Sequence, residues 1–133
     1  MKVFLDTNVL ASAFATRGLC FDVLGEVGTS HVLLTSDLVL EELARALRDK
    51  FEFPSDLVAD DLRLVRQKAA IVQPGVPPLV RPGDNSDVTI LAAAVAGKAD
   101  LFVTGDKELL DIGRVGDLEI ISPRQLWERM AGK

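Results

Sequence analysis

Acidic residues stand at four places at or near the ends of segments that the sequence predicts to be strands or helices. Asp6 and Asp106 each directly or closely follow a short apolar run, Asp87 lies in the first turn of a predicted helix, and Glu41 and Glu42 lie on another. Adjacent helical residues differ by about 100° in direction, so at most one of these two glutamates points into a shared site. Acids at the carboxyl ends of parallel strands share one edge of a sheet. Carboxylates that converge there would bind a hard divalent cation.

Gathering these carboxylates requires a counter-charge. Two carboxylates about 4 Å apart repel by roughly 4 kcal/mol at an effective dielectric constant near 20, so four could not all stay ionised alone. The chain has one histidine, His31, and one cysteine, Cys20, and neither is expected to be a ligand. An all-oxygen site selects Mg²⁺ or Mn²⁺ over zinc.

Helix capping is the alternative explanation for the aspartates. Asp6 and Asp106 would each cap the helix that follows, a position where aspartate is common. Asp84 would cap the next helix in the same way, with Asp87 at its third position, where an acid favours the helix dipole. From these residues alone, capping and metal binding both stay open.

Short apolar runs alternate with longer amphipathic stretches along the chain, which predicts a parallel sheet covered by helices on both faces. Residues 73–83 are rich in proline and glycine and are expected to form a loop. We therefore predict an α/β protein, a three-layer α/β/α fold with a five-stranded parallel sheet. The expected strands are 3–5, 32–34, 70–72, 101–103 and 118–121; the expected helices are 9–14, 19–28, one capped by Ser36 with Leu40, Leu43 and Leu47 on one stripe, 56–69, 84–96, 106–111 and 123–130.

Length and composition indicate a single domain over residues 1–133. A lone cysteine suits a reducing cytoplasm. The start of the chain lacks the features of a signal peptide, and the apolar run 88–96 is about half a membrane span, so we expect a cytoplasmic protein that does not enter the membrane. A net charge of −5 argues against broad adhesion to nucleic acid, but not against an enzyme whose acids surround metal ions.

Four segments of the sequence resemble the PIN-domain family of ribonucleases, and within it the bacterial VapC-like toxins of toxin–antitoxin systems. They are Val3–Leu10 (VFLDTNVL), Ser36–Leu47, Asp87–Ala94 and Ala99–Leu110, which follow the order of the family pattern and are spread over nearly the whole chain. The resemblance implies a five-stranded parallel sheet between helices, with an acidic cleft that binds Mg²⁺ or Mn²⁺.

The resemblance also assigns roles by position. Glu42, not Glu41, matches the family acid because that acid directly precedes a leucine. The implied acidic quartet, which would hold the metal and act in catalysis, is Asp6, Glu42, Asp87 and Asp106; the implied supporting residues are Asn8 and Thr104, with Asp84 as a further ligand or orienting group.

The implied activity is metal-dependent endoribonuclease cleavage of single-stranded RNA, as the toxin of a toxin–antitoxin pair. The implied partners are RNA, a cognate antitoxin protein and a second copy of the chain in a homodimer. Arg45, Arg48 and Lys50 follow Glu42 and are candidates to contact phosphates, although a solvated helix face explains them as well.

Other functions remain as alternatives. A non-catalytic PIN-like module that binds protein or RNA would show no stabilisation by metal. Phosphoryl transfer through Asp6 would call for a second acid two residues later, where Asn8 stands. A receiver domain needs an aspartate after the third strand, and Ile71–Gln73 has none. A dinucleotide-binding fold is disfavoured because no G-x-G-x-x-G follows the first strand.

Overall fold

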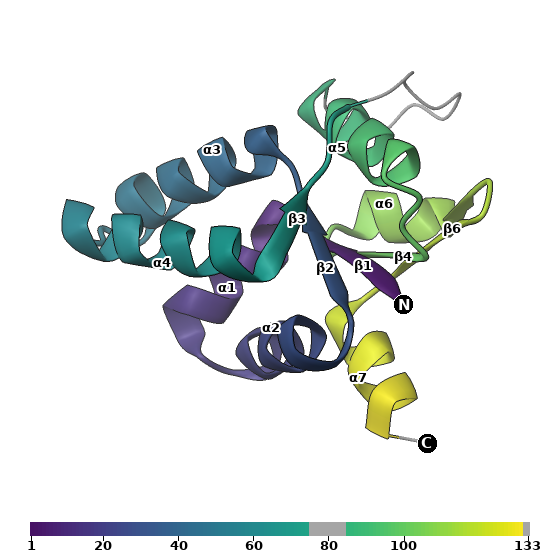
Figure 1. The fold of residues 1–133 in the computed structure, drawn as a ribbon, viewed down its shortest axis with the longest axis horizontal. Coiled ribbons are helices and arrows are strands. Elements are labelled where there is room, and N and C mark those ends of the chain that lie inside the picture. Colours follow the sequence, from purple (N-terminus) through teal and green to yellow (C-terminus); the bar gives the residue numbers. More distant parts are fainter. Residues whose placement is uncertain (75–84, 132–133) are drawn as a thin grey trace.

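A six-stranded sheet forms the centre of the computed structural model, which describes residues 1–74 and 85–131 (Figure 1). The strand order is β3-β2-β1-β4-β6-β5, in which five strands run parallel and β5 pairs antiparallel with β6. The strands are β1 (Lys2–Leu5), β2 (Val32–Thr35), β3 (Ala69–Ile71), β4 (Leu101–Val103), β5 (Arg114–Val115) and β6 (Leu118–Ile121).

Helices cover both faces of this sheet, because each parallel connection must cross over a face to reach the next strand. Figure 1 shows α1 to α4 on one side and α5 and α6 on the other, while α7 packs against α2. The three-layer α/β/α prediction is confirmed. None of the helices in the described ranges is long and apolar enough to cross a membrane. The helices are α1 (Thr7–Thr16), α2 (Leu19–Ser30), α3 (Asp37–Arg45), the π-helix η1 (Ala46–Lys50), α4 (Ser55–Lys68), α5 (Asn85–Ala96), α6 (Lys107–Ile112) and α7 (Pro123–Ala131).

The central strands β1 and β4 are almost wholly buried, as expected for strands covered on both faces. Phe4 and Phe102 lie directly opposite each other in the β1–β4 pair, and their rings stack with centroids 5.5 Å apart. Such aromatic pairs across neighbouring strands add to the stability of the sheet. The stacked pair therefore holds together the two strands that lead into the acidic residues.

The register between β1 and β4 brings Asp6 beside Thr104. Leu5 pairs with Val103, and the Asp6 N–H donates to the carbonyl oxygen of Val103 at 2.9 Å. The Thr104 N–H in turn donates to the carbonyl oxygen of Ile121 on β6 at 3.0 Å. The first residues after two adjacent parallel strands thus lie side by side at the carboxyl edge of the sheet, as the sequence predicted.

The boundaries and the strand count differ from the prediction in small ways. α1 begins at Thr7 instead of residue 9, and β3 lies one residue earlier than expected. The sheet has a sixth strand, β5, which is only two residues long and joins β6 through a tight turn where Gly116 adopts a φ of 59°. A strand this short leaves no period-2 pattern in the sequence, so it could not be predicted.

The helix that carries Leu40, Leu43 and Leu47 buries this stripe as predicted, but it ends in an unexpected way. Its last turn is the π-helix η1, in which the Phe51 N–H donates to the carbonyl oxygen of Ala46 at 3.2 Å. Glu52 follows with a φ of 58°, a left-handed conformation that is uncommon for a residue other than glycine.

Candidate active site

Asp6 is a buried carboxylate with only 4% of its surface exposed, at the point where β1 ends and α1 begins. Its Oδ1 accepts a hydrogen bond of 2.8 Å from the Thr7 N–H and so caps α1. Its Oδ2 accepts from the hydroxyl of Thr104 at 2.8 Å and from the Asn8 side-chain amide at 3.4 Å. Asp6 therefore both caps α1 and lies among the acidic residues of the site.

Burial raises the pKa of Asp6 from its ordinary value of 3.8 to about 6. The hydrogen bonds from Thr104 and from the Thr7 N–H lower this pKa, while the negative charges of Glu42 and Asp106 raise it further. The direction follows from the low dielectric of the site, which penalises the charged carboxylate. A divalent cation beside Asp6 would favour the ionised form and remove this penalty.

Glu42 is the glutamate that faces Asp6. Its Oε1 accepts a hydrogen bond of 3.0 Å from the Thr7 hydroxyl, whereas Glu41 is exposed and lies on another surface of α3. The helix geometry therefore separates the two neighbours, which the buried leucine stripe could not do. Thr7 was missed in the sequence, although it stands next to Asp6 and links the acid of β1 to the acid of α3.

Asp106 caps α6, since its Oδ1 accepts from the N–H groups of Glu108 at 2.8 Å and Leu109 at 3.4 Å. Its own N–H donates to the Thr104 hydroxyl at 3.0 Å, and its charge acts on Asp6. The predicted supporting residues, Asn8 and Thr104, both lie between the two aspartates. Asn8 donates to Thr104 at 3.3 Å and accepts from the Gly105 N–H at 3.1 Å, so it ties the loop after β4 to the start of α1.

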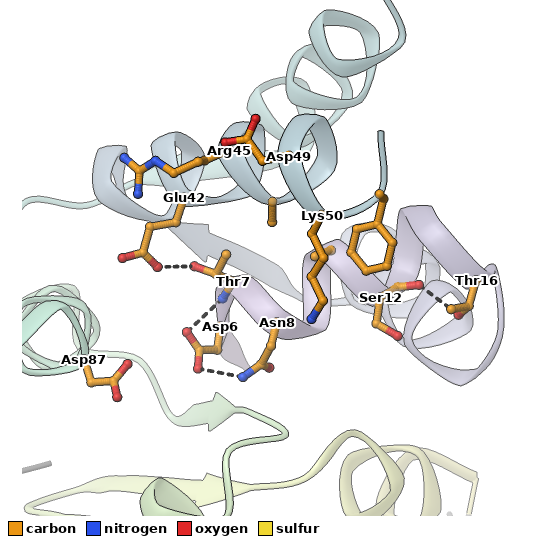
Figure 2. Close-up of a pocket in the computed structure, with 13 residues that line it drawn as sticks. Asp6, Thr7, Asn8, Ser12, Thr16, Glu42, Arg45, Asp49, Lys50 and Asp87 are labelled. Atoms are coloured by element: carbon orange, nitrogen blue, oxygen red, sulfur yellow. Dashed lines mark hydrogen bonds between the residues drawn. The ribbon is translucent and has the colours of Figure 1, made fainter. Parts of the chain in front are cut away.

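An open pocket of about 790 Å³ lies in front of Asp6 (Figure 2). Glu42 and Asp87 line it together with Asp6, and Figure 2 shows Asp87 reaching in from α5, across from α1 and α3. Asp106 is not among the lining residues. Within the part of the chain that the structure describes, the lining comprises Asp6, Thr7, Asn8, Ala11, Ser12, Thr16, Glu42, Arg45, Ala46, Asp49, Lys50, Phe51 and Asp87.

The three basic candidates are placed differently. Arg45 and Lys50 line the pocket, whereas Arg48 does not and instead contacts Asp49 at 3.2 Å in an exposed ion pair. Asp84 lies outside the residues that the structure describes.

The donor set suits a hard cation in its chemistry, because it consists of carboxylates and of hydroxyl and amide oxygens. Burial is the main cause of the raised pKa of Asp6, with smaller contributions from the charges of Glu42 and Asp106, so the ionised carboxylate is unfavourable here without a counter-charge. Over residues 1–74 and 85–131, however, no three histidine, cysteine, aspartate or glutamate side chains stand close enough to hold a metal ion. Asp6, Glu42 and Asp87 line the pocket without being gathered at one point, and Asp106 lies outside the lining.

Replacing Thr104 by valine is expected to lower the free energy of unfolding by about 1–3 kcal/mol at pH 7, because the variant removes hydrogen bonds from a buried carboxylate and from a part-buried backbone N–H. Asp6 loses its shortest side-chain donor, and the Asp106 N–H loses its acceptor. Urea unfolding measures the change. Thr29→Val is the matched control, since the exposed hydroxyl of Thr29 donates only to the Gly25 carbonyl oxygen in α2. A loss no larger than the control's would contradict the expectation.

The fold and the pocket define a class: an α/β protein with an acid-lined pocket at the carboxyl ends of parallel strands. The family model described as PIN domain matches residues 2–108. The chain belongs to the PIN domain family, as the sequence resemblance predicted. No curated protein matches it significantly.

Several solved structures share this fold. VapBC2 from Rickettsia felis, bound to a DNA fragment from its promoter, is 17% identical with a TM-score of 0.68, covering 92% of this chain and 98% of that one. VapBC-1 from nontypeable Haemophilus influenzae is 19% identical with a TM-score of 0.66, covering 93% and 99%. VapC20 from Mycobacterium tuberculosis, a toxin that cleaves the sarcin-ricin loop, is 16% identical with a TM-score of 0.63, covering 88% and 98%.

Proposed function

We propose that this protein is a metal-dependent endoribonuclease that cleaves single-stranded RNA and acts as the toxin of a toxin–antitoxin pair. The observation that carries the proposal is the pocket at the carboxyl edge of the sheet, where Asp6, Glu42 and Asp87 line one open space and the charge of Asp106 acts on Asp6. Membership of the PIN domain family and the likeness to VapC structures support it.

Asp6, Glu42, Asp87 and Asp106 are the residues that would supply carboxylates to Mg²⁺ or Mn²⁺; since no three of them stand together in the described residues, one or two would bind the ion directly and water would complete its coordination. The bound ion would activate a water for attack on a phosphodiester and neutralise the charge that develops on phosphorus oxygens. The residues of the chain itself provide orientation. Thr104 and the Thr7 N–H fix the two oxygens of Asp6, and the Thr7 hydroxyl fixes Glu42.

Arg45 lines the same pocket and would contact a phosphate of the RNA backbone. Its guanidinium can donate two parallel hydrogen bonds to a phosphate. Arg48 is a weaker candidate because it is paired with Asp49.

Two of the structural relatives are VapBC assemblies, which supports a protein partner for this chain; the homodimer is proposed from the sequence resemblance alone. A cognate antitoxin protein would bind this chain, and the chain would form a homodimer. Co-expression with the product of a neighbouring reading frame, followed by size-exclusion chromatography with light scattering, measures both.

The proposed function is tested by cleavage of a 5′-labelled single-stranded RNA with purified protein in Mg²⁺, in Mn²⁺ and in EDTA. We expect internal cleavage with either ion and none in EDTA, with activity returning when excess Mg²⁺ is added back. A single-stranded DNA of the same sequence and a perfect RNA duplex are the substrate controls, and both are expected to react more slowly. Binding of RNA without cleavage under any condition would instead support the non-catalytic module.

A further inference from the structure

The pocket continues well beyond the acidic residues. Away from Asp6 it runs between α1 and η1, where Ser12, Thr16, Lys50 and Phe51 line it. Figure 2 shows Ser12, Thr16 and Lys50 on the side opposite Glu42 and Asp87. A volume of about 790 Å³ is in the range of pockets that hold a complete small ligand, and a site for metal ions alone needs much less. The second end therefore has room for part of a substrate.

Phe51 is the single aromatic residue in the described lining of this pocket. Its side chain is half-buried, in contrast to Phe4, Phe14 and Phe102, which are buried in the core. The ammonium group of Lys50 lies over the Phe51 ring, 5.5 Å from its centroid, so a base would stack on this face only after Lys50 moves aside to a phosphate. An aromatic ring beside a lysine in an open groove is the combination that proteins use to bind single-stranded nucleic acid, with the base on the ring and the cation near a phosphate.

The backbone around Lys50 and Phe51 is unusual, and its conformation determines where these two side chains lie. A π-turn holds one residue more than an α-turn and so rotates the side chains that follow by about 100° around the helix axis. Lys50 ends the π-turn η1 and Phe51 follows it, just before Glu52 adopts its left-handed φ of 58°. Turns of this type and strained residues are often found at functional sites. Here they place a cation and a ring together at the pocket.

We propose that Phe51 stacks on a nucleobase and that Lys50 contacts the adjoining phosphate, in a nucleotide subsite next to the acidic centre. This inference rests on the proposed function. It specifies in addition that the pocket binds one base of the RNA and the adjoining phosphate. Figure 2 shows Glu42 and Asp87 on one side of Asp6 and Lys50 on the other, with the Lys50 side chain extending toward Asn8. Asp49, which also lines the pocket, is partly neutralised by Arg48 at 3.2 Å.

The subsite requires one unpaired nucleotide. A base can lie flat on Phe51 only when it has left its own stack, which excludes a continuous duplex at this position. Stacking tolerates every base, because each has a flat aromatic face. The subsite thus selects single-stranded RNA by its flexibility more than by its sequence.

The test measures binding in EDTA, so that it does not depend on cleavage. A short single-stranded RNA carries the fluorescent base 2-aminopurine at one position, which is moved along the strand in successive oligonucleotides. We expect the wild type to quench one position most strongly, and Phe51→Leu to lose this quenching and bind about 5- to 150-fold more weakly. Phe51→Trp should restore both. Phe53→Leu is the matched control, because Phe53 is also half-buried but does not line the pocket.

A second measurement changes the RNA and leaves the protein intact. Removing the base at the quenched position should weaken binding to the wild type by the same factor, and should have no further effect on Phe51→Leu. Equal affinity and quenching for wild type and Phe51→Leu would overturn the inference, as would an equal base-removal penalty in both proteins. If the wild type cleaves RNA while Phe51→Leu behaves identically, only the inference fails. If the wild type neither binds nor cleaves RNA, the proposed function fails and the inference with it.

Discussion

Replacing Asp6 by asparagine is expected to lower metal-dependent RNA cleavage at least about 100-fold, because loss of a residue that merely supports a metal ligand already costs 10- to 100-fold. Asparagine keeps the shape of the side chain and is equally good as a helix N-cap, so α1 should still form. What the variant loses is the negative charge at the centre of the site, together with one of the two acceptor oxygens: if the remaining oxygen still caps α1, Thr104 and Asn8 lose their acceptor. The measurement is the initial rate of cleavage of the labelled RNA at saturating Mg²⁺.

Asp111→Asn is the control for this experiment, since it makes the same chemical change at an exposed position in the last turn of α6. It should cleave at the wild-type rate. A lower rate in Asp6→Asn alone then cannot be attributed to the purification of variants in general. An Asp6→Asn protein that is folded and retains full activity would remove Asp6 from the mechanism. The proposal that four acids bind the metal would then be wrong for Asp6.

Much of the fold could be predicted because local and global signals agree in this chain. Apolar runs bounded by turn residues and followed by amphipathic stretches indicate parallel strands with crossover helices. The end of β1 and the end of β4 were therefore predictable as neighbours at one edge. This is why Asp6 and Asp106, which are 100 positions apart in the sequence, could be paired from the pattern of residues alone.

The finer geometry of the site depends on tertiary contacts that leave no pattern in the sequence. The buried leucine stripe of α3 lies between Glu41 and Glu42 and does not choose between them; the hydrogen bond of Thr7 to Glu42 does. The direction of the Asp106 side chain, with one oxygen capping α6, likewise depends on the loop around Thr104. The sequence therefore predicted where the strands end, but not the orientation of the carboxylates of Asp6 and Asp106 that follow them.

Phe51 could not be predicted to line the pocket for a different reason. A regular α-helix continued from Leu40 through Leu47 would direct residue 51 elsewhere, because each added residue rotates by about 100°. The π-turn of Ala46–Lys50 changes that direction, and no propensity scale identifies a π-turn in advance. Such a local departure from the regular pattern is where a functional role is expected.

Asp6→Asn is also expected to make the metal-free protein more stable at neutral pH, the opposite of its effect on cleavage. In the wild type the folded-state pKa of Asp6 is about 6, above its ordinary value of 3.8. As the pH rises through the lower value the unfolded chain releases this proton, while the folded protein keeps it until the pH passes about 6. The unfolded state therefore binds fewer protons in this window, and stability falls as pH rises.

The size of the effect is about 3 kcal/mol, obtained by converting the pKa shift of this buried group into free energy. Asparagine does not titrate, so the variant should gain up to this amount over the wild type above pH 6 and nothing below pH 4. Urea unfolding in EDTA at pH 4, 5, 6 and 7 measures the difference. Parallel curves for the two proteins over this range would mean that Asp6 is not held in the environment described above.

Added Mg²⁺ should reverse the order of the two proteins. An ion that binds only the folded state at 1,000 times its dissociation constant stabilises that state by about 4 kcal/mol, which exceeds the penalty of about 3 kcal/mol at Asp6. The wild type should therefore rise in melting temperature by several degrees, with little change in Asp6→Asn. The same substitution then separates two explanations of the pocket. If the pocket is a metal site, Mg²⁺ raises the melting temperature of the wild type more than that of Asp6→Asn. If it is a surface that only binds partners, Mg²⁺ changes neither melting temperature.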